Sequence, residues 1–206
     1  NPIEILENKQ FGEKSDYAER FPYIGTGTRP PGNNPHVICE WIRKNGLILE
    51  EFLPFNDSLQ SFDEYITPDP LPIWLTDNGK KWLETKTFNH DWGWNQVNSV
   101  QEKHERQKDM LRYCPVSVSV CAWRESSGIY YKDDGDTDNH WTSCVAYEGN
   151  NPIIFDSYPP FIKKLEANYD FGYSKRYVLD KKPIELKKNE SYLKRLFGFW
   201  CKEVFA

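Results

Sequence analysis

The sequence predicts an α+β fold in which a helical N-terminal lobe, residues 1–112, packs on an antiparallel β lobe, residues 113–206. Two observations support this division. Apolar residues recur at helical spacing in the first half, most clearly between Pro35 and Gly46, whereas from Pro115 onwards they alternate with polar residues as in a strand. At 206 residues and 24.3 kDa, the chain is long enough to bury a substantial core.

Two helices are expected near the N-terminus. Pro2 suits a first helical turn, and Ile3 and Leu6 lie on one face, so the first helix should begin at or before residue 1. Ser15 is a partial N-cap for a second, short helix over residues 17–21.

The clearest helix follows a loop over residues 25–33. Asn34 is suited to the N-cap and Pro35 to the first helical position, and Gly46 is suited to end the helix. Its apolar stripe consists of Val37, Ile38, Trp41 and Ile42. The pattern therefore predicts a helix that buries one face and begins directly after the loop.

The rest of the N-terminal half is less regular. Residues 53–94 show little periodicity and are expected to wrap the surface, whereas residues 96–112 favour one exposed, highly charged helix. His36 and His104 are interpreted as ordinary surface residues, and His90 as a loop histidine without an identifiable partner.

The C-terminal half reads as a series of strands. Val116, Val118 and Val120 alternate with polar residues, which predicts a half-buried strand. The further strand candidates, with a turn over residues 148–151 between the first two, are 141–147, 153–155, 177–179 and 196–205.

Charge and composition exclude several classes of function. The formal charge of −5, with both signs interspersed, argues against a nucleic-acid partner. No apolar run is long enough to span a bilayer and no signal peptide is visible, so we expect a soluble chain without a membrane partner, in a compartment that the sequence leaves open. The five cysteines form no CxxC pair and are expected to be reduced, buried thiols.

An acidic segment, Asp133, Asp134, Asp136 and Asp138 around Gly135, resembles a calcium loop only loosely. It lacks the spaced oxygens and the distal Glu of a full site, so a solvated acidic loop is the better interpretation. No metal and no cofactor are expected.

The pair with catalytic potential is His140 and Asp156. His140 opens one predicted strand and Asp156 follows the next, so antiparallel pairing would bring the imidazole and the carboxylate together. A carboxylate on one ring nitrogen fixes the tautomer and raises the basicity of the other nitrogen, as in a nucleophilic triad. A surface histidine beside a strand-terminal aspartate is the alternative.

Several motifs in order resemble the papain-like cysteine peptidases. Residues 114–120 (CPVSVSV) are similar to the family's Gly-Pro-Val-Ser-Val strand, Asn139-His140 with Val145-Ala146-Tyr147 to its histidine segment, and Asp156-Ser157-Tyr158 to its Asn-Ser-Trp. In the helical half, residues 31–46 resemble the Gly-Gly substrate-binding loop with its helix, and residues 49–55 the Glu-Glu-x-Tyr-Pro-Tyr that follows.

The resemblance implies a two-lobed fold with a β-barrel-like C-terminal lobe, and an endopeptidase that binds an extended polypeptide. By resemblance, His140 is the catalytic imidazole and Asp156 its partner. The substrate-binding residues would be Gly32, Asn33, Asn34, Pro35, Trp141 and Tyr158. Three departures stand out: Asp156 replaces an Asn, Tyr158 replaces a shielding Trp, and Trp141 replaces a small residue, which would narrow the specificity pocket.

The nucleophile is the missing part. Residues 3–6 and 15–19 resemble the family's sequence within and just after the nucleophile helix, so the catalytic Cys and the oxyanion-hole Gln would lie upstream of Asn1. Two alternatives stay open: a non-catalytic binding or structural module of this fold, possibly in a larger assembly, and Cys39 as a replacement nucleophile, which its mid-helix position disfavours.

Overall fold

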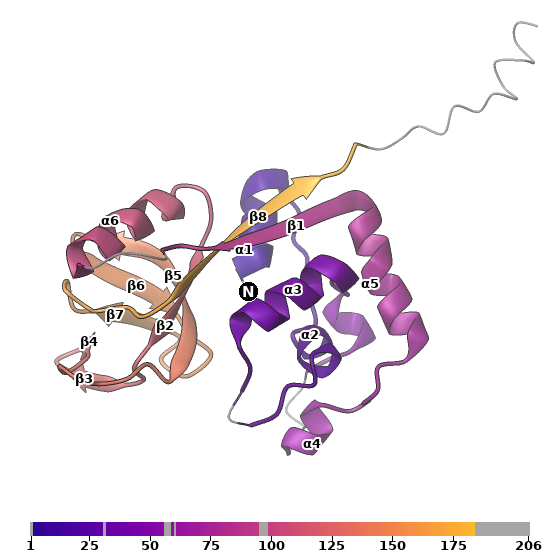
Figure 1. The fold of residues 1–206 in the computed structure, drawn as a ribbon, viewed down its shortest axis with the longest axis horizontal. Helices are drawn as coiled ribbons and strands as arrows, with labels where there is room; N and C mark the ends of the chain where they lie inside the picture. Colours follow the sequence, from indigo (N-terminus) through magenta and orange to yellow (C-terminus); the bar gives the residue numbers. More distant parts are fainter. Residues whose placement is uncertain (1, 31, 56–58, 60, 95–98, 184–206) are drawn as a thin grey trace, which may run out of the picture.

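The computed structural model describes residues 2–30, 32–55, 59, 61–94 and 99–183. Figure 1 shows most of the helices gathered on one side and most of the strands on the other, with the long strands β1 (Lys86–Trp92) and β8 (Ser174–Lys181) running between the two groups. The predicted α+β fold class is confirmed. β1 comes from the first half of the chain and pairs with β8, so the two halves share one sheet.

The helices are short. They are α1 (Pro2–Phe11), α2 (Arg20–Gly25), α3 (Pro35–Asn45), a 3₁₀ turn (Glu50–Phe52), α4 (Phe62–Tyr65), α5 (Ile73–Thr85) and α6 (Val100–Leu111). The predicted helix at the N-terminus is confirmed by α1, which buries Ile3 and Leu6. α6 confirms the described part of the charged helix.

α3 begins and ends where the sequence predicts. The Asn34 side chain accepts a hydrogen bond from the backbone N–H of His36 at 2.8 Å. At the other end, Gly46 has a φ of 74°, and a Cβ there would collide with the backbone of Gly79 in α5. One residue of the predicted apolar stripe is wrong, because Val37 is exposed. The buried residues of α3 are Cys39 and Ile42.

Two predictions for the N-terminal half are wrong. Ser15 caps no helix; Tyr17 instead forms an isolated β-bridge with Leu49, and α2 begins only at Arg20. The segment 53–94 is not an irregular wrap, because it contains α5 and β1. The buried stripe of α5, Leu75, Gly79 and Trp82, contains a glycine, and β1 buries only Phe88, so neither element shows a clear apolar period.

A single eight-stranded sheet runs in the order β1-β8-β2-β5-β6-β7-β4-β3. The remaining strands are β2 (Val116–Val120), β3 (Arg124–Ser126), β4 (Ile129–Tyr131), β5 (His140–Glu148), β6 (Asn151–Phe155) and β7 (Ile162–Leu165). Described neighbours pair antiparallel except β4 and β7. The strands predicted from Val116, at 141–147, at 153–155 and at 177–179 are confirmed, and the candidate at 196–205 lies outside the described residues.

Three apolar clusters hold the molecule together. One lies inside the β lobe around Val116, Val118 and Tyr169, and one lies inside the helical lobe around Phe21. The third joins α1, α3 and α5 to β1 and β8 and includes Leu6, so it fixes the two lobes against each other.

His104 is a correction to the surface assignment. It is 7 % exposed, its Nε2 lies 2.9 Å from the carbonyl oxygen of Tyr169, and its Nδ1 lies 3.0 Å from the hydroxyl of Tyr147. The helix α6 is therefore not a freely exposed helix: it packs one face, with His104 and Gln107, against β5. Charged neighbours in sequence concealed this buried polar face.

No helix among the described residues has the length and apolar character that crossing a membrane requires.

Candidate active site

His140 and Asp156 meet at one end of the β5–β6 hairpin. Nε2 of His140 lies 2.7 Å from Oδ1 of Asp156. His140 is the first residue of β5 and Asp156 directly follows β6, so antiparallel pairing brings the two ends together as the sequence predicts. Thr142 adds a bond across the same pair of strands, from its hydroxyl to the carbonyl of Phe155 at 2.6 Å.

Both carboxylate oxygens of Asp156 are satisfied. Oδ1 also accepts the backbone N–H of Ser157 at 2.7 Å, and Oδ2 accepts from Nζ of Lys163 at 2.8 Å. Burial by itself raises the pKa of Asp156, but the hydrogen bonds from Lys163 and His140 outweigh it, and the pKa lies below its usual value. Asp156 is therefore an ionised carboxylate, although it is 1 % exposed.

This arrangement fixes the tautomer of His140. An ionised carboxylate only accepts hydrogen bonds, so Nε2 of His140 must carry the proton that points at Asp156. Nδ1 is left to act as a base or acid. The ring is flanked by Tyr158, with centroids 5.4 Å apart, and by Trp123 at 5.9 Å, and its side chain stays 19 % exposed.

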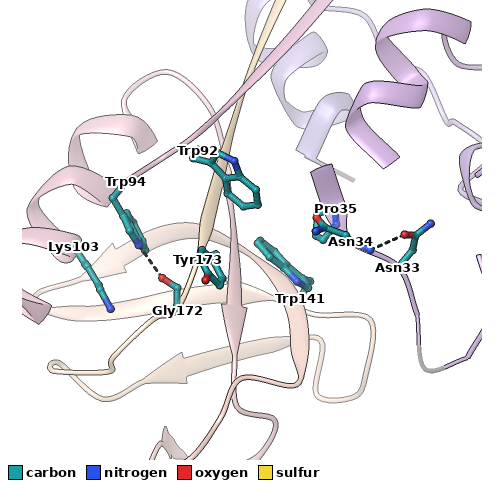
Figure 2. A pocket seen from close by; sticks show the side chains of 9 residues that line it. All are labelled: Asn33, Asn34, Pro35, Trp92, Trp94, Lys103, Trp141, Gly172 and Tyr173. Atoms are coloured by element: carbon teal, nitrogen blue, oxygen red, sulfur yellow. Dashed lines mark hydrogen bonds between the residues drawn. The ribbon is translucent and has the colours of Figure 1, made fainter. Parts of the chain in front are cut away.

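A cavity of about 720 Å³ is lined by Trp141, the residue that follows His140, but by neither His140 nor Asp156. Figure 2 shows Trp92, Trp141 and Tyr173 on the sheet side and Asn33, Asn34 and Pro35 on the side that leads into α3. Trp141 directly follows His140 in β5, and alternation along the strand turns its ring to the opposite face of the sheet. The cavity is thus lined by residues from both lobes.

Four of the six residues predicted to bind substrate line this cavity: Asn33, Asn34, Pro35 and Trp141. The other two do not. Tyr158 lies against the ring of His140, and Gly32 lies in the loop with a φ of 139° and open space where a Cβ would be. The loop is held from within, since Asn33 donates from its side chain to the hydroxyl of Thr28 at 3.0 Å.

Sequence reasoning missed the remaining lining residues, which are Trp92, Trp94, Lys103, Gly172 and Tyr173. Trp92 and Trp94 alternate with Gly93, a period of two that could have indicated a strand end. Trp94 donates to the carbonyl of Gly172 at 2.8 Å, as drawn in Figure 2, which joins two segments 78 residues apart. No local signal links Gly172 to Trp94.

Lys163 was also missed. Its position in a strand with Lys164 suggested nothing beyond a charged edge, yet Lys163 is 2 % exposed and its ammonium group touches Asp156. β7 itself was not predicted, because its four residues carry two lysines.

A second polar cluster lies where the lobes meet, and it corrects the assignment of His90 as a loop residue without a partner. His90 is part of β1; its Nε2 lies 3.1 Å from Oε1 of Glu40 and its Nδ1 lies 2.9 Å from Nζ of Lys175. His36 is exposed as predicted, but its Nδ1 lies 3.1 Å from the same Nζ.

The described cysteines are all free thiols, and none has a hydrogen bond to His140. Burial raises the pKa of Cys39 to about 11 and that of Cys144 to about 12, and it also raises the pKa of Cys114. A nucleophilic thiol requires the opposite shift. Cys39 is packed in the cluster between the lobes, which favours its interpretation as a structural residue.

Neighbouring cations pair with three of the four aspartates of the acidic loop. Arg124 pairs with Asp133 and with Asp136, and Lys132 pairs with Asp138 at 2.7 Å. Within the described ranges, no group of three or more His, Cys, Asp or Glu residues could hold a metal ion.

Comparison with solved structures places this arrangement in a known fold. The chain is similar to the cysteine protease CMS1MS2 of Carica candamarcensis, solved with E-64, with a TM-score of 0.54 at 13 % identity over 84 % of this chain and 82 % of that one. It is also similar to the bromelain protease of Ananas comosus, solved with the E64 inhibitor, with a TM-score of 0.55 at 12 % identity over 87 % and 85 %.

A third likeness is to digestive procathepsin L 3 of the Tenebrio molitor larval midgut, with a TM-score of 0.58 at 15 % identity over 85 % of this chain and 60 % of that one. Comparisons with protein-family models and with curated protein sequences found no match. At these identities the likenesses define the fold: the chain has the papain-like fold that its motifs predict.

Proposed function

We propose that this chain is the main part of a papain-like cysteine endopeptidase, in which His140 carries the proton and Asp156 orients it. The observation that carries the proposal is the 2.7 Å contact between Nε2 of His140 and the buried Oδ1 of Asp156, at one end of the β5–β6 hairpin. The proposal assigns the nucleophilic thiol to sequence upstream of Asn1, on the motif resemblance of residues 3–6 and 15–19.

The chemistry follows from the free ring nitrogen. Nδ1 of His140 would take the thiol proton, and the thiolate sulfur would then bond to the carbonyl carbon of the peptide. His140 would return that proton to the leaving amine nitrogen as the C–N bond breaks, and water would hydrolyse the resulting thioester with His140 again as base. Asp156 would keep Nε2 protonated and stabilise the imidazolium.

Substrate binding is proposed in the cavity between the lobes. An extended peptide would run along the loop at Gly32 and Asn33, where an exposed backbone could form hydrogen bonds to it. Aromatic walls at Trp92 and Trp141 favour an apolar substrate side chain in the cavity. Tyr158 would shield the bond between His140 and Asp156 from water.

The test uses the full gene product, purified with and without His140→Ala. Both proteins are incubated with E-64, and intact mass followed by peptide mapping identifies any modified residue. We expect one adduct, on a cysteine upstream of Asn1, and at least a 100-fold slower reaction in His140→Ala, since general-base catalysis contributes about 10²–10⁴-fold.

Two results would contradict the proposal. A full gene product without a cysteine upstream of Asn1, and without labelling, would favour a non-catalytic binding module. Labelling confined to Cys39 that is lost in Cys39→Ser would instead move the nucleophile to α3.

A further inference from the structure

Lys163 is a buried cation with every donor satisfied. Its Nζ lies 2.8 Å from Oδ2 of Asp156, 2.6 Å from the carbonyl oxygen of Tyr158 and 2.8 Å from that of Pro160. The ammonium group also lies 5.2 Å from the ring centroid of Trp123. Lysine is almost never fully buried unless it is paired, so this position has a specific partner.

The partner is the carboxylate that holds His140. One oxygen of Asp156 faces His140 and the other faces Lys163, so the carboxylate links the imidazole to the ammonium group. Asp156 and Lys163 have opposite unit charges at a contact distance of 2.8 Å. The imidazole of His140 therefore faces an ion pair of Asp156 and Lys163 that has no net charge, and not an isolated anion.

We propose that Lys163 is a positioning residue for His140: it cancels the charge of Asp156 and holds the carboxylate in place, so that the imidazole is oriented without being locked in its protonated form. The inference rests on the proposed role of His140 as the proton carrier. It explains how an ionised aspartate can occupy this place beside a general base. An unpaired buried carboxylate within hydrogen-bond distance would favour the imidazolium.

The same lysine also shapes the segment over the imidazole. By binding the carbonyl oxygens of Tyr158 and Pro160, it holds the turn between β6 and β7 closed over its own side chain. The ring of Tyr158 is thereby kept 5.4 Å from that of His140. Charge cancellation and placement of the aromatic cover thus depend on one buried side chain.

The loop that precedes His140 carries further charged groups. Most of these groups are paired with one another, Lys132 with Asp138 at 2.7 Å and Arg124 with Asp133 and Asp136, whereas Asp134 has no ion pair in the described part of the chain. Among the described residues, the rings of Trp123 and Tyr158 also flank the imidazole, and of these two only the tyrosine can titrate. Asp156 and Lys163 are therefore the two charges to vary.

The experiment is an NMR titration of the ring Cε1 proton of His140 in the full chain, read independently of activity. The chain has four histidines, so His140→Gln assigns the resonance. We expect Lys163→Met to move the titration midpoint up by about one pH unit or more, and Asp156→Asn to move it down by a similar amount. The double variant Asp156→Asn/Lys163→Met should return it close to the parent value.

Lys164→Met is the matched control, because Lys164 is the adjacent lysine, is 34 % exposed and pairs with Glu148 on the surface. It should leave the midpoint unchanged. If Lys163→Met does not fold, Asp156→Asn and the double variant still test the proposal, since the double variant buries no unpaired charge. A midpoint that differs by less than 0.3 units between these two, or an unmoved midpoint in folded Lys163→Met, would overturn it.

The two proposals fail separately. The expected midpoint shifts without E-64 labelling in the parent chain would leave the role of Lys163 standing and remove the peptidase activity. E-64 labelling of the parent chain with no midpoint shift in the variants would support the peptidase activity and remove the proposed role of Lys163.

Discussion

Lys175 and His90 meet where β8 pairs with β1, with Nζ of the lysine 2.9 Å from Nδ1 of the histidine. Lys175 is fully buried and its ammonium group also lies 4.1 Å from the ring centroid of Trp92, which lines the cavity. Because the amine donates to Nδ1, that nitrogen must be unprotonated, and Nε2 of His90 then donates to Glu40. A neutral imidazole therefore connects the two lobes.

Acidification through the histidine range is expected to destabilise the fold. Burial and the neighbouring Lys175 lower the pKa of His90, and burial lowers that of His104. With a lowered pKa, the unfolded chain binds more protons than the folded one, so these contributions are complete above about pH 6.5 and decline as the pH falls below it. Urea unfolding at several pH values between 5 and 8 measures the slope.

His90→Gln and His104→Gln should each flatten that slope below about pH 6.5, because each removes one group that protonates only on unfolding. A parent slope that both variants leave unchanged would show that neither histidine is held neutral.

Tyr17→Phe is expected to lower the free energy of unfolding by about 1–3 kcal/mol. The hydroxyl of Tyr17 donates to the buried carboxylate of Glu7 at 2.7 Å and accepts from Nε1 of Trp82 at 2.8 Å. Its loss leaves the indole N–H without this acceptor and removes one partner of Glu7, which keeps its ion pair with Lys86 at 2.7 Å. Denaturant unfolding measures the change. Tyr113→Phe, at a side chain that is 73 % exposed, is the control and should be neutral within error.

Asn34→Ala is expected to cost about 1 kcal/mol of stability by removing the N-cap of α3. Loss of the cap should fray the first turn of α3, which faster hydrogen exchange at the amides of His36, Val37 and Ile38 would detect. Asn34→Ser keeps a capping oxygen and should restore most of the stability. Equal losses in both variants would mean that the side chain acts by packing instead.

Trp141→Ala should enlarge the cavity and change which side chains it accepts. In the full gene product, we expect kcat/KM for peptides with a large apolar side chain to rise about 10-fold relative to peptides with a small one. Trp74→Ala removes an indole that is 52 % exposed on α5 and serves as the control. An unchanged preference would mean that the cavity does not contact the substrate side chain.

Local patterns in the sequence were enough to predict where several helices and strands begin or end. The capping group of Asn34 and the stop at Gly46 depend on neighbours within a few residues, and both are as predicted. The alternation from Val116 to Val120 likewise predicted a strand with its valines buried, although Ser119 on the other face is buried too. The contact between His140 and Asp156 could be anticipated because a short hairpin makes it almost local.

The motif resemblance, together with this local periodicity, determined the α+β class and which imidazole and carboxylate would meet. Only the tertiary structure decided what surrounds them. Lys163 belongs to a strand too short and too charged to recognise, and His90 and Lys175 meet across 85 residues. Burial of a charged group depends on which distant segments cover it, and the sequence near that group carries no record of the segments that pack against it.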